Sequence, residues 1–114
     1  MPLIQLTTNR PLDDTDRDAF LAMLSTTVAK TLGKPEQYVM VNLTINRNML
    51  FAGSAEPLAY VELKSLGLPE EDTKRFSAQL SNIISDRLGV PAARIYIEFS
   101  SPPRHMWGWN GATF

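Results

Sequence analysis

Residues 57–100 of the chain read PLAYVELKSLGLPEEDTKRFSAQLSNIISDRLGVPAARIYIEFS. The β-rich run 57–63 predicts a strand. Proline and three acidic residues at 69–72 then favour the start of a helix, because carboxylates stabilise the positive end of a helix dipole. Apolar residues follow at helical spacing: Phe76, Leu80, Ile83, Ile84 and Leu88. Gly89 supplies a left-handed cap, and 94–100 predicts another strand, so the stretch forms one strand–helix–strand unit.

The same order of elements occurs about 55 residues earlier. Residues 2–8 predict a strand, and the acidic residues Asp13, Asp14 and Asp16 predict a helix start. The apolar stripe of this helix consists of Phe20, Leu21, Leu24, Val28 and Leu32. Its end, Leu32-Gly33-Lys34-Pro35, matches Leu88-Gly89-Val90-Pro91, and 38–45 predicts the closing strand. A further short strand is expected at 49–51.

Two strand–helix–strand units in succession predict an α+β fold with a pseudo-twofold axis. We expect a four-stranded mixed sheet with two helices on one face, because right-handed crossovers place both helices on the same side. The length of 114 residues is enough for one core, so 1–114 is predicted to be a single domain.

The helix-free face of this sheet is predicted to be an interaction surface. Apolar residues occupy alternate and adjacent positions of the strand at 38–45, namely Val39, Met40, Val41, Leu43 and Ile45. Bare apolar sheet of this kind predicts an obligate oligomer. The tail at 107–110 is expected to be an edge strand without a partner in its own chain; alternatively, it forms a tryptophan-rich lid over the monomer's core.

The composition excludes several classes of function. The net charge is −1 with interspersed signs, which indicates neither a nucleic-acid nor a membrane surface. The chain has no cysteine and only one histidine, His105, which excludes thiolate catalysis and histidine-cluster metal sites. No signal peptide or membrane span is recognisable. We expect a cytoplasmic protein, although secretion by a non-classical route would leave no mark in the sequence.

Pro2 directly follows the initiator methionine and is a candidate general base. Removal of Met1 would expose a secondary amine at Pro2. Burial and a neighbouring cation both disfavour the protonated form of an amine, which lowers its pKa towards the range that proton transfer at carbon requires. A chance proline at this position is the alternative, and a retained Met1 would make the Pro2 nitrogen an amide.

Six spaced blocks resemble the macrophage migration inhibitory factor family of the tautomerase superfamily. They are Met1-Pro2, Leu32 to Tyr38, Phe51 to Pro57, Lys64 to Gly67, Arg94 to Ile97, and Gly108-Trp109-Asn110 with Thr113-Phe114. The resemblance covers the whole chain in order. It implies a homotrimer of β-α-β-β-α-β subunits and keto–enol tautomerisation of phenylpyruvate-like α-keto acids without a cofactor or metal.

The resemblance also implies roles for individual residues. Pro2 would be the catalytic base, Lys34 the cation that binds the substrate carboxylate, and the backbone N–H of Leu66 a second donor. Lys34 alternatively complements the dipole of the preceding helix. Tyr96 and Glu98 share one face of their strand, because side chains alternate. In the family this tyrosine comes from the neighbouring subunit.

Four further aromatic residues are expected to line the pocket around the substrate ring: Tyr38, Trp107, Trp109 and Phe114. Plain packing is their alternative role, since pockets and interfaces share an enrichment in aromatic residues.

The sequence departs from the mammalian members in two places. Glu98 stands where they carry asparagine, and a carboxylate there would repel an anionic substrate unless a cation such as Lys34 or an arginine pairs with it. It would also raise the pKa of the Pro2 amine. We therefore expect either weaker activity towards phenylpyruvate or a different substrate. The mammalian Cys-x-x-Cys pair is replaced at 58–61 by Leu-Ala-Tyr-Val, which excludes thiol–disulfide activity.

Two other functions stay open. One is a cytokine-like protein that binds a host receptor through its trimer surface and has only vestigial catalysis. The other is a dehalogenase or decarboxylase of the same superfamily that acts by hydration, with Glu98 orienting the water.

Overall fold

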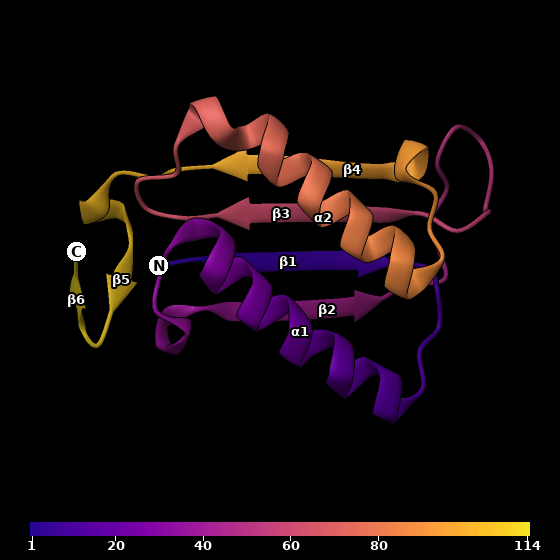
Figure 1. Ribbon diagram of the computed structural model, residues 1–114, viewed down its shortest axis with the longest axis horizontal. Coiled ribbons are helices and arrows are strands. Elements are labelled where there is room, and N and C mark those ends of the chain that lie inside the picture. The colour runs from indigo at the N-terminus through magenta and orange to yellow at the C-terminus, as the bar shows by residue number, and fades with distance from the viewer.

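The computed structural model describes residues 1–114 and is built on a four-stranded sheet of order β2-β1-β3-β4 (Figure 1). The strands are β1 (Leu3–Thr8), β2 (Met40–Ile45), β3 (Ala59–Lys64) and β4 (Ile95–Ser100). Each strand–helix–strand unit joins a parallel pair, β1 with β2 and β3 with β4, while the central pair β1 and β3 is antiparallel. The predicted mixed sheet and its pseudo-twofold repeat are confirmed.

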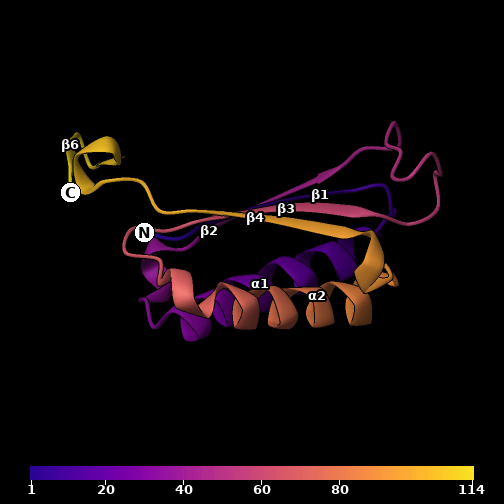
Figure 2. The same cartoon turned by 90° about the horizontal axis from the view of Figure 1, so that it is seen from above.

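Both helices, α1 (Asp14–Leu32) and α2 (Thr73–Leu88), cover the same face of the sheet (Figure 2). Asp13 caps α1, because its side chain accepts a hydrogen bond from the Asp16 N–H at 2.7 Å. The acidic residues before α2 form a separate 3₁₀ turn, Glu70–Asp72. Gly33 and Gly89 end the two helices in the left-handed conformation, with φ of 64° and 69°.

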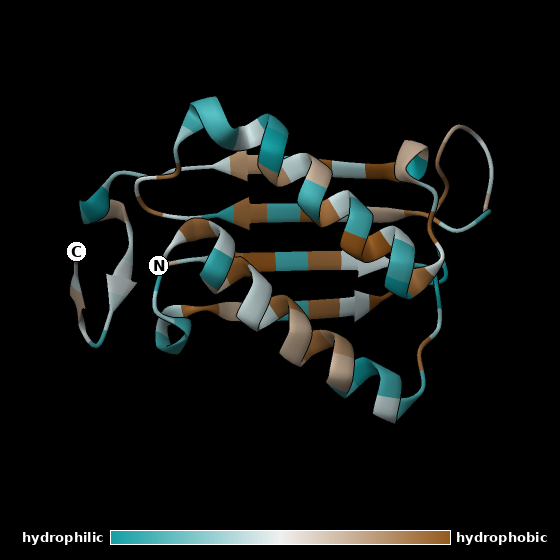
Figure 3. Ribbon diagram, in the orientation of Figure 1, coloured by the Kyte–Doolittle hydropathy of each residue, from teal (hydrophilic) through white to brown (hydrophobic).

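The core lies between the helices and the sheet. Alternate residues of the two central strands, Ile4 and Leu6 of β1 with Val61 and Leu63 of β3, are almost completely buried there. The predicted helix stripes supply the other side: Phe20, Leu24, Val28, Phe76, Leu80, Ile84 and Leu88 are buried. Figure 3 shows apolar and polar residues alternating along the strands, as a sheet with one covered face requires.

The helix-free face is mostly polar, so the prediction of a bare apolar face was wrong. The register places these residues on it: Leu3, Gln5, Thr7, Met40, Asn42, Thr44, Tyr60, Glu62, Lys64, Tyr96, Glu98 and Ser100. Val41 and Leu43 instead pack against the core on the helix side. Strand β2 is an edge strand with one covered face, and Met40 is its main exposed apolar residue at 65%.

The loop between β2 and β3 contains no strand at 49–51. Phe51 and Ser54 instead form an isolated antiparallel bridge around a tight turn. Arg94, in the 3₁₀ turn Ala92–Arg94, anchors this loop by donating hydrogen bonds to the carbonyl oxygens of Phe51, Ser54, Glu56 and Pro57 at 2.9–3.1 Å.

The C-terminal tail does have a partner in its own chain, which corrects the prediction of an unpaired edge strand. After the 3₁₀ turn Arg104–Met106, strand β5 (Gly108–Trp109) pairs with β6 (Ala112–Thr113) in a hairpin. The hairpin projects beyond the sheet at the end where β1 begins, so both chain termini lie together (Figures 1 and 2). None of the helices combines the length and apolar character needed to cross a membrane.

Candidate active site

The chain start lies at the end of the sheet beside the C-terminal hairpin (Figure 1). Pro2 is fully buried, and its carbonyl accepts a hydrogen bond from the Met40 N–H at 3.0 Å, which extends the β1–β2 pairing to Pro2. Met1 precedes Pro2 and is half-buried. While Met1 is attached, the free amine belongs to Met1 and the Pro2 nitrogen is an amide.

This end of the molecule disfavours a protonated amine. Burial, followed by the positive charges of Lys34 and Arg104, holds the pKa of the amino terminus below its ordinary value of 8.0. Both cations therefore act on the amine, although one follows α1 and the other belongs to the turn before β5.

Lys34 owes its place to the end of α1. Gly33 reverses the helix in the left-handed conformation, and the Lys34 N–H then donates to the Ala29 carbonyl at 2.9 Å. Its side chain is half-buried. Leu66, the expected backbone donor, is buried in the turn after β3, which ends beside β1 because the two strands are antiparallel.

Three of the four expected aromatic residues form one cluster. The rings of Tyr38 and Trp109 meet edge to face with centroids 5.6 Å apart, and Trp109 stacks on Phe114 at 5.8 Å. Trp109 is still 51% exposed, so the cluster leaves an aromatic surface open to solvent. Tyr38 reaches it from the 3₁₀ turn Glu36–Tyr38 that precedes β2.

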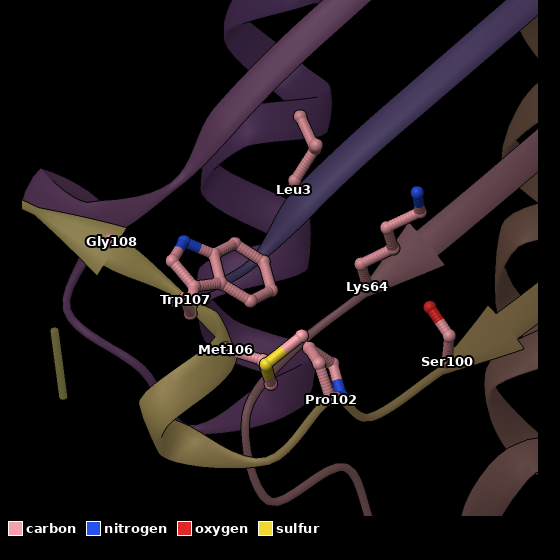
Figure 4. A pocket seen from close by; sticks show the side chains of 7 residues that line it. All are labelled: Leu3, Lys64, Ser100, Pro102, Met106, Trp107 and Gly108. Carbon is pink, nitrogen blue, oxygen red and sulfur yellow. The ribbon is translucent and has the colours of Figure 1, made fainter.

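The fourth aromatic residue, Trp107, lines an open pocket of about 440 Å³ next to the chain start (Figure 4). The pocket is lined by Leu3, Lys64, Ser100, Pro102, Met106, Trp107 and Gly108. Lys64 and the Trp107 ring lie on opposite sides of it (Figure 4). Leu3 directly follows Pro2, so this pocket adjoins the candidate base.

One protomer does not bring Tyr96 to Pro2. Leu3, Lys64 and Ser100 are aligned across β1, β3 and β4 at the Pro2 end of the sheet. Tyr96 lies four residues back along β4, roughly 13 Å away at the usual rise of a strand. There it packs on Phe51, with ring centroids 4.7 Å apart, and is 65% exposed.

Glu98 does not pair with Lys34 within the protomer. Its carboxylate accepts a hydrogen bond from the Tyr60 hydroxyl at 2.9 Å, and the same hydroxyl lies 3.1 Å from Glu62. The hydrogen bond to Glu98 and the second carboxylate raise the pKa of Tyr60 to about 12. Glu98 forms no ion pair within the protomer; Glu62 instead pairs with Lys64 at 3.6 Å.

The family is settled by comparison with known proteins. The model of the family described as "Macrophage migration inhibitory factor (MIF)" matches residues 1–114. The chain belongs to this family. A macrophage migration inhibitory factor homolog of Trichinella spiralis is 37% identical over 115 residues, covering 100% of both chains. The rat macrophage migration inhibitory factor is 33% identical, covering 100% of this chain and 99% of the rat protein.

Solved structures of the family agree with the fold. The crystal structure of a macrophage migration inhibitory factor homologue from Prochlorococcus marinus superimposes with a TM-score of 0.91 at 42% identity, and 98% of each chain is covered. The factor of Trichinella spiralis gives a TM-score of 0.90 at 34% identity, covering 98% of this chain and 99% of that one. Membership places the chain in the tautomerase superfamily, for which tautomerase activity is typical.

The sequence did not lead us to select two residues that lie near the chain start, Arg104 and Lys64. Arg104 lies in a loop without periodicity, and its only signal was its place just before the tryptophan-rich tail. Lys64 belongs to a block that resembles the family, but its location beside Leu3 depends on the β1–β3 register. No group of three or more side chains with suitable ligand atoms could hold a metal ion.

Proposed function

We propose that the processed protein, which begins at Pro2, is a cofactor-independent keto–enol tautomerase of phenylpyruvate-like α-keto acids. The observation that carries this proposal is that burial, followed by the positive charges of Lys34 and Arg104, lowers the pKa of the amino terminus. Removal of Met1 would transfer the free amine to Pro2, which is buried more deeply than Met1. The same burial and the same two cations would lower the pKa of the Pro2 amine, which favours its neutral, basic form near pH 7.

The reaction needs one proton to move between carbon and oxygen. The neutral Pro2 nitrogen accepts a proton from the carbon next to the keto group, which leaves an enolate. The protonated Pro2 then returns the proton, directly or through water, to the enolate oxygen, which gives the enol and restores the neutral base. The substrate is neither oxidised nor reduced. Lys34 and the Leu66 N–H bind the carboxylate, and the positive charge of Lys34 also stabilises the enolate in the transition state.

The Tyr38, Trp109 and Phe114 cluster supports a substrate with an aromatic ring. Its rings offer an apolar surface at the same end of the sheet as Pro2, and aromatic rings stack on one another favourably. Trp107 adds a fourth aromatic side chain, in the pocket next to Leu3.

Assembly as a homotrimer is part of the proposal. Tyr96 and Glu98 lie away from Pro2 in one protomer, and their strand β4 is an edge strand on the helix-free face. A neighbouring copy would supply these two residues to the Pro2 site, as the family resemblance implies. The bond from Tyr60 to Glu98 is compatible with this, because it leaves Glu98 on the exposed face.

The decisive test compares the parent with a Pro2→Gly variant, both with the amino terminus defined by mass spectrometry. Enolisation of phenylpyruvate by the parent is expected, with a loss of about 10²–10⁴-fold in the variant, the usual contribution of a general base. A third sample that retains Met1 should be equally inactive, because its Pro2 nitrogen is an amide. Equal rates in the parent and Pro2→Gly would exclude Pro2 as the base and leave a role in protein interaction.

A further inference from the structure

Neither of the proposed carboxylate ligands, Lys34 and Leu66, lines the pocket formed by Lys64 and Trp107. Lys34 follows α1, whereas Lys64 ends β3 on the helix-free face, across from Leu3. The amine at the chain start therefore has the Lys34 site near it and, beyond Leu3, a second pocket. A substrate that reaches from one to the other would pass the reacting amine.

Within one protomer, Lys64 is the only charged residue that lines this pocket, and the Ser100 hydroxyl group lies beside it (Figure 4). The rest of the wall is apolar: Leu3, Pro102, Met106 and Trp107. An apolar wall with one cation and one hydroxyl group suits an organic chain or ring that ends in an anion.

Lys64 is available to bind such an anion, because its existing ion pair is weak. Its one ion pair, with Glu62, has a long N–O distance of 3.6 Å, and the two side chains are 42% and 28% exposed. Exposed pairs of this kind contribute little stability, so a better-placed carboxylate can replace Glu62. Glu62 in turn has the Tyr60 hydroxyl group as an alternative partner at 3.1 Å.

We infer that Lys64 is a specificity residue that favours dicarboxylic α-keto acids, whose second carboxylate lies at the end remote from the keto group. This inference rests on the proposed tautomerase function. Lys34 would bind the carboxylate next to the keto group, and Lys64, with Ser100, would bind the remote one. A substrate with a neutral group of the same size in place of the remote carboxylate would form no ion pair with Lys64.

Two substrates of equal shape test the assignment: phenylpyruvate with a para-carboxylate and phenylpyruvate with a para-carboxamide. The parent should show a kcat/KM about tenfold or more higher for the carboxylate, the range expected for a hydrogen bond to a charged group. Lys64→Met should abolish this preference and Lys64→Arg should retain most of it. Lys74→Met, an exposed lysine on α2, is the matched control and should keep the parent's preference.

Calorimetric binding of the same two compounds separates this inference from the proposed function, because it needs no turnover. If neither compound is enolised but the carboxylate still binds more tightly to the parent than to Lys64→Met, the tautomerase proposal fails and the anion site stands. A carboxylate preference that persists in Lys64→Met, or that is absent from the parent in both assays, would overturn the role of Lys64.

Discussion

Two charged side chains add to burial in lowering the pKa of the amine at the chain start. Lys34 and Arg104 approach it from different segments, and their charges add to the effect of burial on the amine pKa. Arg104 is exposed and forms no ion pair, so its positive charge is not neutralised by a carboxylate of the protomer. Its effect on the amine is therefore electrostatic, and a pH profile is the way to detect it.

The Arg104→Met variant should shift the acidic limb of the kcat/KM profile to higher pH. The base is active only when neutral, and a nearby cation lowers its pKa by disfavouring the protonated form. Removing the cation lets the pKa rise towards its ordinary value, so activity is lost at a higher pH on acidification. Lys74→Met serves as the control; an unchanged limb in Arg104→Met would show that its charge does not reach the base.

At the level of elements, the loop between β2 and β3 supports the exposed residue Tyr96. The loop between β2 and β3 is held mainly by Arg94, whose guanidinium also lies 5.2 Å from the centre of the Phe51 ring. Phe51 in turn packs on Tyr96. Arg94 therefore contacts Phe51, and Phe51 contacts the exposed Tyr96.

Arg94→Ala should destabilise the fold by about 2–3 kcal/mol, because several charged hydrogen bonds to backbone carbonyls are lost together. Arg94→Lys keeps the charge but not the planar fork, so it should recover only a minor part. Chemical denaturation gives the free energy of unfolding, and amide exchange at 51–57 should accelerate in both variants. Parent-like stability in Arg94→Lys would mean that the charge alone holds the loop.

The internal repeat made the helices, the four strands and their pairing predictable, because periodicity and glycine caps are local signals. Three features were not predicted correctly: the absence of a strand at 49–51, the polar helix-free face and the terminal hairpin. The apolar run 39–41 gave no indication of which face its side chains take, since consecutive apolar residues hide the alternation of a strand. The terminal hairpin had a usable signal: Asn110-Gly111 adopts φ of 52° and 75°, and Asn-Gly is a strong hairpin turn.

The site was predictable only as far as the family blocks extend. Pro2, Lys34 and Tyr38 lie within such blocks, and the structure places all of them at one end of the sheet. Nothing in the sequence indicated that Tyr60 donates a hydrogen bond to Glu98, because the two residues are 38 positions apart and meet only through the pairing of β3 and β4. The pattern of one chain also defines no interface, so it does not assign site residues to a second copy.

For the whole molecule, we expect a homotrimer in solution. The helix-free face carries Met40 and Tyr96, both 65% exposed, among polar groups, and the two outer strands β2 and β4 have unpaired edges. Free edges readily accept another strand. Sedimentation equilibrium should give three times the mass of one chain, and specific activity should fall on dilution below the dissociation range. A monomer of full activity would contradict both the assembly and the contribution of Tyr96.

The shared location of the two termini has a practical consequence for anyone producing this protein. An affinity tag fused ahead of Met1 would keep the proline nitrogen acylated, and one fused after Phe114 would extend from the hairpin that carries Trp109. Either fusion would obstruct the same end of the molecule, so recombinant material should be tagless or carry a tag that a protease removes back to a native end.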